Sequence, residues 1–342
     1  MKIKRILYVG ECNGNSLCRL NAMKRLGYSV EVVTPRKFLP DSAWVSRIFW
    51  RFSGIFFVPW INVGLKKFLK KRATYDLVWV NAGDYLFPSS VEILKQATKK
   101  IVNYNTDDPY GKRDGNRHLG YLKSVPLYDL IVVVRKPNIA EAYQFGAKQV
   151  YFTFMTADEI EHKPVDLTKS DKGKYKFDVL FLGTWFPERG PFMLKLIELG
   201  VPLTIVGPNW GKSPEWPKLK NCVASNGFFG KDYSKAIQES KICLGLLSKG
   251  NRDEHTTRSM EIPALGSLFC AERTTEHEFL YKDGVEAVFW RTPEECAEKC
   301  LGLLQNPSLI DEISKNGNTK VYKNGSFNED MIKSVLGRVI NQ

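Results

Sequence analysis

Short apolar runs alternate with helical patterns along this chain, and no other feature constrains its fold as strongly. Runs such as RILYVG, SVEVVT, DLVWVN and DLIVVV in the first half, and FDVLFLG, PLTIVG, ICLGLL and SLFCAE in the second, are separated by amphipathic stretches. Strands that are apolar on both faces occur in parallel sheets covered by helices on both sides. The alternation therefore predicts an α/β protein with doubly wound, Rossmann-like sheets.

A polar segment interrupts this alternation and divides the chain. Residues 159–176 (EIEHKPVDLTKSDKGKYK) contain many charges and have no helical or strand period. The 342 residues also exceed the roughly 250–300 at which a single core stops growing. We expect an N-terminal domain over 1–160, a linker over 161–176, a C-terminal domain over 177–323 and a final helix over 324–342. Two doubly wound domains would face a central cleft in which ligands bind.

Basic residues outnumber acidic ones, with 50 Lys and Arg against 37 Asp and Glu and a formal net charge of +13. Such a surplus attracts nucleic acid, anionic lipid or phosphorylated small molecules. The seven cysteines form no CxxC pair and no zinc-binding spacing, as expected in a reducing compartment. We find no signal peptide and no run of the roughly 18 apolar residues that span a membrane, so we expect a cytoplasmic protein.

The segment FLGTWFPERG places a strand, a glycine turn and a helix start in succession. Backbone N–H groups at a helix start attract phosphate, so we predict that Gly183, Thr184 and Arg189 bind a diphosphate. The alternative is an ordinary turn with a surface arginine. The chain has no G-x-x-x-x-G-K-[ST] loop, and YVGECNGN lacks the third glycine of the dinucleotide fingerprint, which disfavours ATPase activity and NAD binding.

The segment GNRDEHTTRSMEIPALGS follows the strand ICLGLL and begins another helix. Arg252, His255 and Arg258 can converge there on an anion, since the guanidinium fork of arginine suits a diphosphate. Glu261 lies one turn beyond Arg258 and can accept hydrogen bonds from a ribose. Residues at i and i+3 are also neighbours on a helix, so an exposed Arg258–Glu261 ion pair of about 0–1 kcal/mol is equally open.

The stretch GNRDEHTTRSMEIPALGSLFCAERTTEHEFLYKDGVEAVFW resembles the C-terminal signature of the CgeB-like "glycosyl transferases group 1" family, which has the GT-B fold. The matching run is Arg-x-x-Glu-Ile-Pro-Ala-x-Gly, then a strand, a short acidic helix ending in Phe, and a Gly-x-Glu-x-x-x-Phe strand. The residues that carry it are Arg258, Glu261, Ile262, Pro263, Ala264, Gly266, Phe279, Gly284, Glu286 and Phe289.

The resemblance implies a transferase that uses a nucleotide-activated sugar, such as a UDP-, GDP- or dTDP-sugar, held by the C-terminal domain. The implied diphosphate-binding residues are Arg258, Arg189, Gly183, Thr184, Arg252, His255 and Thr257. Glu261 would bind the ribose, and Asn226, Gly227 and Phe228 the base. Asp253 stands where many retaining relatives have the first of two glutamates, so its contact with the donor sugar and the anomeric outcome stay open.

The chain contains no Asp-x-Asp pair that could hold a divalent ion. The charge of the leaving group would then be met by arginines and a helix N-terminus. We therefore expect neither a metal nor another cofactor.

Carboxylates at strand ends of the first domain are candidates for the acceptor side. We expect Gly10, Glu11, Asn13 and Asp84 to lie there. If the enzyme inverts, it needs a base, and adjacent carboxylates raise one another's pKa when they are close and partly buried. Our first choice is Asp108 in YNTDDPY, followed by Asp107 and by His118 in RDGNRHLGY. The alternatives are that an aspartate begins a turn at Pro109 and that His118 is structural.

Residues 42–72 form an insertion that joins bulky aromatic side chains to Arg47, Arg51 and the closing run KKFLKKR. This composition suits the surface of an anionic bilayer, although the aromatic residues can instead pack into the first domain. We favour shallow peripheral contact with the inner face of the cytoplasmic membrane, because a lipid-linked acceptor would explain both the insertion and the net charge.

We conclude from the sequence that the chain transfers a sugar to a cell-surface glycan or lipid-linked saccharide, in polysaccharide biosynthesis, with no nucleic-acid partner. One alternative is a non-catalytic basic protein that binds nucleic acid or an anionic membrane. Another is a GT-B enzyme of a different reaction, such as a nucleotide-sugar epimerase, which would need no separate acceptor.

Overall fold

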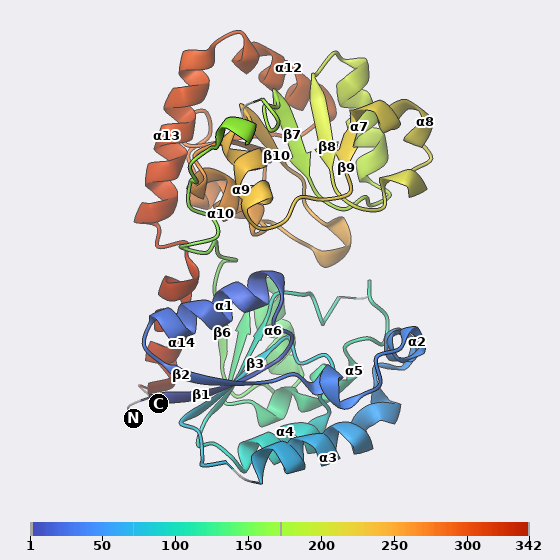
Figure 1. The fold of residues 1–342 in the computed structure, drawn as a ribbon, viewed down its shortest axis with the longest axis vertical. Coiled ribbons are helices and arrows are strands. Elements are labelled where there is room, and N and C mark those ends of the chain that lie inside the picture. The colour runs from blue at the N-terminus through green and yellow to red at the C-terminus, as the bar shows by residue number, and fades with distance from the viewer. Residues whose placement is uncertain (1–2, 71, 112, 172, 341–342) are drawn as a thin grey trace. The chain divides into compact units, whose positions relative to one another are not determined.

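The computed structural model describes residues 3–70, 72–111, 113–171 and 173–340. The chain divides into two compact units (Figure 1). The first comprises Met1–Phe154, Lys249–Arg252 and Asn328–Gln342, and the second comprises Met155–Ser248 and Asp253–Phe327. Each unit contains one six-stranded sheet in which all strands run parallel, so the predicted doubly wound α/β fold is confirmed.

The sheet of the first unit has the strand order β2-β1-β3-β4-β5-β6. Its strands are β1 (Arg5–Val9), β2 (Ser29–Val33), β3 (Leu77–Asn81), β4 (Ile101–Asn105), β5 (Leu130–Val133) and β6 (Val150–Phe152). The central strands are buried on both faces because helices cover both sides of the sheet. These helices include α1 (Gly14–Arg25), α4 (Pro88–Lys95), α5 (Leu119–Ser124) and α6 (Pro137–Gln144).

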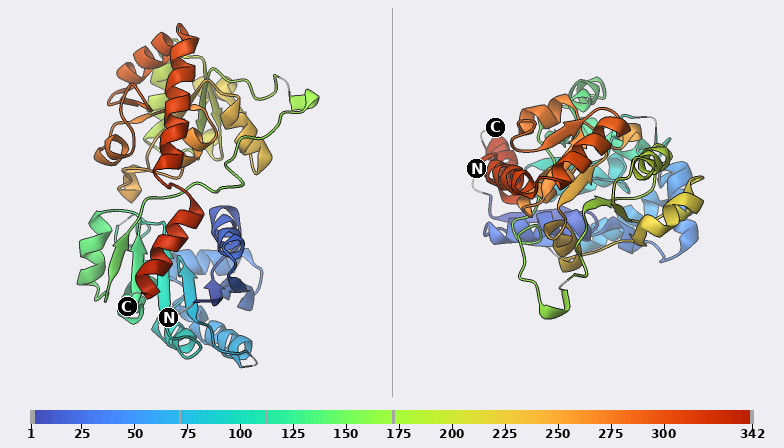
Figure 2. Two further views of the ribbon diagram at one scale, coloured as in Figure 1. Left: turned by 90° about the vertical axis from the view of Figure 1, so that its left-hand side faces the viewer. Right: turned by 90° about the horizontal axis from the view of Figure 1, so that it is seen from above.

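The C-terminal helix α14 (Asn328–Ile340) belongs to the first unit, which the sequence could not establish. It packs beside α1 and near β6 (Figure 2). Arg25 of α1 pairs with Glu329 at 2.8 Å, and the hydroxyls of Tyr151 and Ser334 are 2.6 Å apart. The apolar face of this helix is buried, since Met331, Ile332, Val335 and Val339 all lie in the core.

The insertion of the first unit folds into α2 (Ala43–Phe52), the short 3₁₀ turn η2 (Ile55–Phe57) and α3 (Val58–Leu69). One face of these elements joins the core, where Val45, Phe49, Phe57, Ile61 and Leu65 are buried. The predicted packing of the insertion into the first domain therefore accounts for its inner apolar positions.

The sheet of the second unit has the strand order β12-β11-β10-β7-β8-β9. Its strands are β7 (Val179–Leu182), β8 (Leu203–Val206), β9 (Val223–Ser225), β10 (Ile242–Gly245), β11 (Leu268–Glu272) and β12 (Val288–Trp290). Its helices are α7 (Arg189–Glu198), α8 (Trp216–Leu219), α9 (Lys231–Gln238), α10 (Arg258–Ala264), α11 (Thr275–Leu280), α12 (Pro293–Leu304) and α13 (Pro307–Lys323).

Each sheet has one point at which the strand order reverses direction. It lies between β1 and β3 in the first unit and between β7 and β10 in the second. At such a point the loops that leave the two neighbouring strands diverge to opposite faces and leave a crevice at the carboxyl ends of the strands. The two reversal points are therefore the places where each unit is expected to bind a ligand.

The turn after β7 packs tightly against Gly207, which follows β8. A Cβ atom at Gly207 would lie 2.0 Å from the carbonyl oxygen of Gly183. We expect Gly207→Ala to lower the free energy of unfolding by about 3 kcal/mol, because a backbone atom must move. Gly211→Ala is the matched control, since a Cβ there meets nothing within 4 Å. Urea denaturation of both variants tests this, and equal stability of the two would contradict the tight packing.

Candidate functional site

Arg258 lies at the strand-order reversal of the second unit. It is the first residue of α10, and its Nε–H donates to the carbonyl oxygen of Leu182 at 2.7 Å. Leu182 is the last residue of β7. Arg258, which follows β10, is therefore hydrogen-bonded to the carboxyl end of the neighbouring strand. The guanidinium is half-buried and stands at the reversal point, where a doubly wound sheet is expected to bind a ligand.

A second guanidinium, that of Arg189, is buried close to the first. Its Nη1 donates to the carbonyl of Thr184 at 2.8 Å, and its Nη2 donates to the carbonyls of Leu246 and Leu247 at 3.2 and 3.3 Å. Burial and the charge of Arg258 lower the pKa of Arg189 to about 10, against the opposing effect of two carboxylates, so the group stays charged at pH 7. Two neighbouring cations, each hydrogen-bonded to backbone carbonyls of its own, form a site that an anion stabilises.

Glu261 does not pair with Arg258. Its Oε2 accepts a hydrogen bond from the hydroxyl of Tyr233, and its Oε1 lies 3.7 Å from Nε2 of His162. The side chain is buried beneath the carboxyl edge of the sheet, and the described residues contain no ion pair between it and Arg258. The exposed ion pair that the spacing left open is thus absent from this part of the chain. A carboxylate has several lone pairs, so the contact with Tyr233 leaves acceptor capacity for a ribose hydroxyl.

The other residues predicted to bind the donor fall into two groups. Gly183, Thr184 and Thr257 surround the two arginines at the ends of β7 and the start of α10, and Asp253 is close enough to act on the charge of Arg189. The second group follows β9 at the same edge of the sheet and consists of Asn226, Gly227 and Phe228. The hydroxyl of Ser225 bonds both the N–H and the carbonyl of Gly227, which fixes the backbone of this turn.

Two residues predicted to bind the diphosphate are placed elsewhere. Both ring nitrogens of the buried His255 are occupied, Nδ1 by Glu276 at 2.5 Å and Nε2 by the N–H of Met155 at 2.9 Å. The segment Lys249–Arg252 groups with the first unit, and Arg252 forms a two-pronged ion pair with Asp108, with both distances 2.7 Å. His255 is therefore a structural residue, and Arg252 has no part in the arginine pair.

The first unit has a cavity of about 200 Å³ at its own strand-order reversal. It is lined by residues that follow β1, β3 and β4, which include the predicted acceptor-side residues and one predicted base: Gly10, Glu11, Asn13, Asp84 and Asp107. Tyr85 and Arg117 also line it. The fold thus brings together carboxylates that lie up to 96 positions apart in the sequence, from Glu11 to Asp107.

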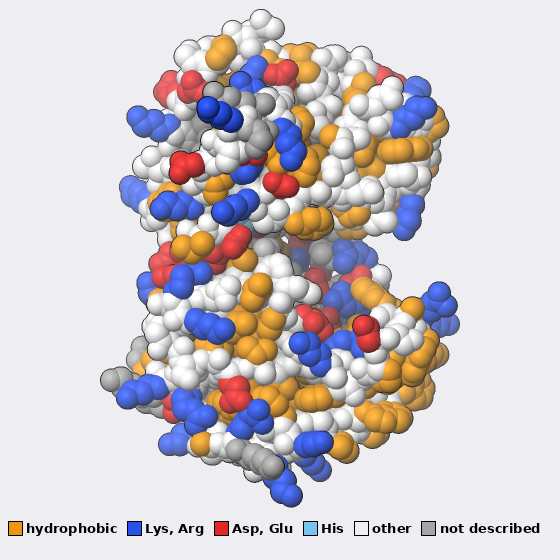
Figure 3. Space-filling model, viewed as in Figure 1, with side chains coloured by type: hydrophobic (Ala, Val, Ile, Leu, Met, Phe, Trp, Pro, Cys, Tyr) orange, Lys and Arg blue, Asp and Glu red, His pale blue; other side chains and the backbone are white. Residues whose placement is uncertain are grey.

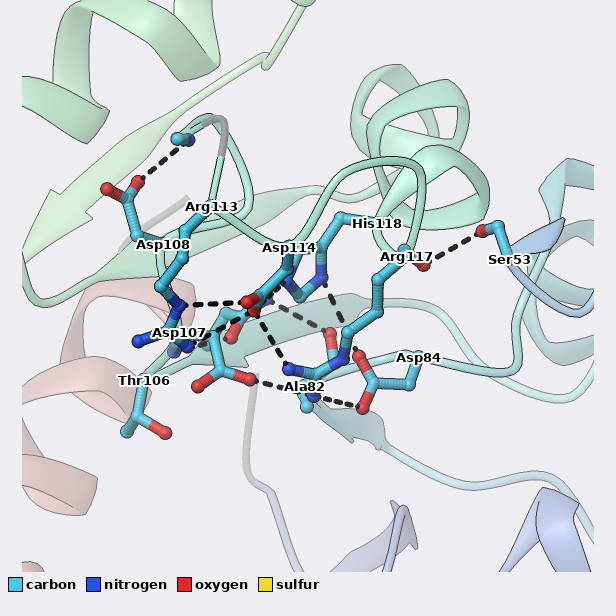
Figure 4. A network of polar contacts seen from close by, with 12 residues as sticks. Ser53, Ala82, Asp84, Thr106, Asp107, Asp108, Arg113, Asp114, Arg117 and His118 are labelled. Atoms are coloured by element: carbon cyan, nitrogen blue, oxygen red, sulfur yellow. Dashed lines mark hydrogen bonds and ion pairs between the residues drawn. The ribbon is translucent and has the colours of Figure 1, made fainter. Parts of the chain in front are cut away.

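Arg117 is the centre of a polar network in this cavity, as Figure 4 shows. Its Nη2 contacts Asp84 at 2.8 Å and Asp107 at 3.0 Å, and its Nη1 contacts Asp114 at 3.2 Å. The carboxylates raise the pKa of Arg117 in spite of its burial. The sequence reasoning missed Arg117, although its place three residues after Asp114 and next to His118 was a usable signal.

His118 lies behind the cavity between two carboxylates. Its Nδ1 is 3.7 Å from Asp84, its Nε2 is 3.6 Å from Asp114, and only 2% of the residue is exposed. Neither ring nitrogen has a hydrogen-bond partner among the described residues. Burial lowers the pKa of His118 below its ordinary 6.5, Arg117 adds to this, and the neighbouring aspartates oppose it. The ring is therefore neutral at pH 7 and can take up a proton.

Asp108, our first choice as the base, lies outside the cavity and points away from the network around Arg117 (Figure 4). Its carboxylate accepts hydrogen bonds from Arg252, from Asn138 at 2.9 Å and from the N–H of Gly111 at 3.1 Å. Burial acts to raise the pKa of Asp108, but Arg252 and Asn138 lower it overall. A carboxylate that is permanently ionised and fully bonded is a structural group, and the geometry favours Asp107 and His118 over it.

One group of described residues has the donor types and spacing of a metal site. The sulfur atoms of Cys270, Cys296 and Cys300 lie within 4.8 Å of one another, between β11 and α12. All three are buried in the core of the second unit, as apolar side chains would be. These three cysteines differ in chemistry from the carboxylates and arginines at the two reversal points, and they belong to neither site.

Residues 189–331 match a protein family described as "Glycosyl transferase-like", which confirms the resemblance seen in the sequence. A search of curated proteins by sequence gives no match.

Solved structures support the same fold. The Anabaena protein HepE in complex with UDP-glucose has a TM-score of 0.70 at 14% identity, over 98% of this chain and 99% of that one. Sucrose-phosphate synthase from Thermosynechococcus elongatus has 0.69 at 14%, over 99% and 98%. A putative UDP-N-acetylglucosamine 2-epimerase from Listeria monocytogenes has 0.55 at 12%, over 92% and 91%. The predicted GT-B fold is confirmed.

The network around Arg117 predicts how His118 titrates. In NMR spectra recorded against pH, we expect the midpoint of His118 below 6.5, because burial disfavours the charged ring. Asp84→Asn should lower the midpoint further, since it removes a carboxylate that stabilises the imidazolium. Asp41→Asn, at a fully exposed side chain, is the control and should leave it unchanged. A midpoint above 6.5 would contradict the buried position of the ring.

Proposed function

We propose that this chain is a nucleotide-sugar-dependent glycosyltransferase and that the arginine pair of the second unit holds the diphosphate of the donor, because residues 189–331 are glycosyl transferase-like and the fold is GT-B. The observation that carries this proposal is the position of Arg189 and Arg258. Both guanidinium groups are charged, both are fastened to backbone carbonyls, and both lie at the strand-order reversal of that unit.

We propose that the donor is a uridine diphosphate sugar with a hexose of the glucose type. HepE, whose fold this chain shares, has been solved with UDP-glucose. The turn after β9 offers backbone groups and the ring of Phe228 to the base, and the carboxylate of Glu261 is available to the ribose. The ribose contact rests on the buried Glu261, which Tyr233 holds in one orientation.

The reaction breaks the bond between the anomeric carbon and the diphosphate and forms one to an acceptor oxygen. Negative charge develops on the departing diphosphate, and preorganised positive groups stabilise that charge most effectively where water is excluded. We propose that Arg258 and Arg189 fulfil this role without a metal ion. Because Arg189 is already desolvated and fixed by three carbonyls, it needs little rearrangement when the charge develops.

We propose that the cavity of the first unit holds the acceptor hydroxyl, which belongs to a saccharide. Asp84 and Asp107 would accept the hydrogen bond of this hydroxyl and fix the position of its oxygen. Arg117 holds both carboxylates through Nη2, and the buried Oδ1 of Asp84 lies 3.7 Å from Nδ1 of His118. If the transfer inverts the anomeric centre, the proton passes to Asp84 and the neutral His118 behind it shares that proton.

The arginine pair predicts a specific loss of donor affinity. We expect Arg258→Ala to weaken the binding of UDP and UDP-glucose about 100-fold, because charge-assisted hydrogen bonds to phosphate contribute about 1.5–3 kcal/mol each. Isothermal titration calorimetry measures this directly. Arg252→Ala is the matched control and should bind UDP within twofold of the parent, since Arg252 is engaged by Asp108 and Glu141.

Two outcomes of that titration would overturn the donor proposal. One is equal loss in both arginine variants, and the other is no binding of any nucleotide sugar by the parent protein. Binding to polynucleotide with a steep salt dependence would favour the nucleic-acid alternative. Conversion of a UDP-sugar in the absence of acceptor would favour an epimerase. The Listeria monocytogenes protein that matches with a TM-score of 0.55 is a putative enzyme of that kind.

The acceptor cavity predicts a different kinetic pattern. Asp107→Asn should lower kcat about 10- to 100-fold and leave the affinity for UDP unchanged, because loss of a positioned hydrogen bond or base acts on the chemical step. Asp166→Asn, at a residue with no predicted role, serves as the control. Loss of UDP affinity in Asp107→Asn would contradict the assignment of this cavity to the acceptor.

A further inference from the structure

An aromatic surface covers the outer side of α2, η2 and α3. We define it by seven exposed apolar side chains with exposed fractions from 43% to 67%: Trp44, Trp50, Phe52, Ile55, Phe56, Trp60 and Val63. Among the described residues, these are seven of the seventeen large apolar side chains that are exposed, although they span only positions 44–63. A concentration of this kind marks an interaction site and is rare on the surface of a monomeric soluble protein.

The aromatic surface is not a by-product of packing the insertion. The inner positions of the same elements, among them Val45, Phe49 and Ile61, already supply apolar groups to the core and are 0–4% exposed. The outer aromatic groups are therefore additional to what the fold needs. Trp60 and Val63 are one turn apart and lie on the same face of α3, so they project in one direction.

The charge of this stretch selects an anionic partner. Residues 42–75 contain seven basic residues and no acidic residue. Arg47, Arg51, Lys66, Lys67 and Lys70 are exposed, and Lys66 and Lys70 make no ion pair within the described residues. Figure 3 shows hydrophobic side chains gathered where α2 lies, with Lys and Arg side chains near them. A second copy of the chain is disfavoured as a partner, because a two-fold contact would set seven positive charges against seven.

A shallow cavity of about 250 Å³ lies at the C-terminal end of α3. Lys66, Lys70 and Arg72 line it, together with Thr74 and Gln96. Arg72 is partly neutralised by Glu31, whereas the two lysines keep their charge for a ligand. The size and the donors of this cavity suit a phosphate-bearing headgroup.

The two helices meet at an angle that fits a position on a bilayer. Among the described residues, no single helix has the length and apolar character of a membrane span, and the pair Ala43–Phe52 and Ile55–Leu69 passes such a test only together, with a bend of 119°. Because the inner faces of both helices are buried in the core of the first unit, the pair cannot enter the bilayer without unfolding. Helices of this composition lie in the plane of the interface.

The aromatic surface is one layer of side chains away from the acceptor cavity. The guanidinium of Arg117 lies 4.6 Å from the ring centre of Trp50, and the hydroxyl of Ser53 donates to the carbonyl of Arg117 at 2.8 Å. Phe49 stacks on Tyr85 of the cavity wall with ring centres 4.2 Å apart. A molecule anchored beneath the aromatic surface could thus present its polar head to the cavity.

We propose that the outer side of α2, η2 and α3 docks on an anionic lipid bilayer, with the aromatic residues in the interface, the lysines on phosphate headgroups, and the saccharide of a lipid-linked acceptor at the neighbouring cavity. The last part rests on the proposed function, whereas the docking itself does not. The five exposed basic residues, at about 1 kcal/mol each, together with inserted aromatic rings, are sufficient for stable peripheral binding.

Cosedimentation of the full chain with large unilamellar vesicles tests the docking. We expect binding to phosphatidylcholine vesicles that contain 30% phosphatidylglycerol, and at least tenfold weaker binding to pure phosphatidylcholine. Trp60→Ser/Val63→Ser should reduce binding to the anionic vesicles at least tenfold. Ile160→Ser/Val285→Ser, which removes two exposed apolar side chains of the second unit, is the matched control and should bind like the parent.

Four results would overturn the proposal: no binding of the parent protein to anionic vesicles, equal loss in the control variant, self-association through this surface in light scattering, or an aromatic-dependent preference for a DNA duplex. UDP titration of the same variants separates this proposal from the proposed function, because the Trp60→Ser/Val63→Ser variant should bind UDP within twofold of the parent. Vesicle binding without any UDP binding would leave the docking intact and overturn the donor site alone.

Discussion

The reversal of strand order in each sheet is the constraint from which the polar chemistry of this protein follows. A parallel sheet buries its strands on both faces, so charged side chains can gather only where strands end and loops diverge. Arg189 lies beyond the end of β7 and Arg258 beyond the end of β10. In the same way Glu11 follows β1 and Asp84 follows β3. In both units the groups that could act on a ligand stand at the strand-order reversal, next to fixed backbone atoms.

The side chains at the strand-order reversal differ in charge between the two units. In the second unit two guanidinium groups are anchored by carbonyls, so the site is short of negative charge, and the diphosphate that we propose as its ligand would complete it. In the first unit three carboxylates share Arg117, so the site is rich in hydrogen-bond acceptors and suits hydroxyl groups. This difference follows from burial and pairing, and it is the basis on which we propose the second unit for the donor and the first for the acceptor.

The sequence was sufficient to predict the features that depend on local patterns. The strands and their parallel arrangement follow from apolar runs, the family from the stretch around Arg258, and the arginine pair from two helix starts. It was insufficient where a partner lies far along the chain. Asp108 looked like a free carboxylate because Arg252, which pairs with it, is 144 positions away, and His255 looked like a ligand because Glu276 was not recognised beside it. A lone polar residue looks the same in sequence whether a distant partner occupies it or not.

The insertion supplies side chains both to the core of the first unit and to an exposed surface. Because its helices have one face toward the core, Phe49 and Ile61 are buried while Trp60 and Val63 are exposed. The core and the outer surface therefore use different positions of the same helices. Loss of an inner side chain leaves a cavity and costs about 2–5 kcal/mol, whereas loss of an outer one such as Trp60 or Val63, which are 61% and 67% exposed, removes much less packing. Because Phe49 and Ser53 also support the wall that carries Tyr85 and Arg117, the inner face links the stability of the insertion to the shape of the acceptor cavity. The outer face is free to change with the partner it contacts, and this independence is what makes its aromatic and basic composition informative about that partner.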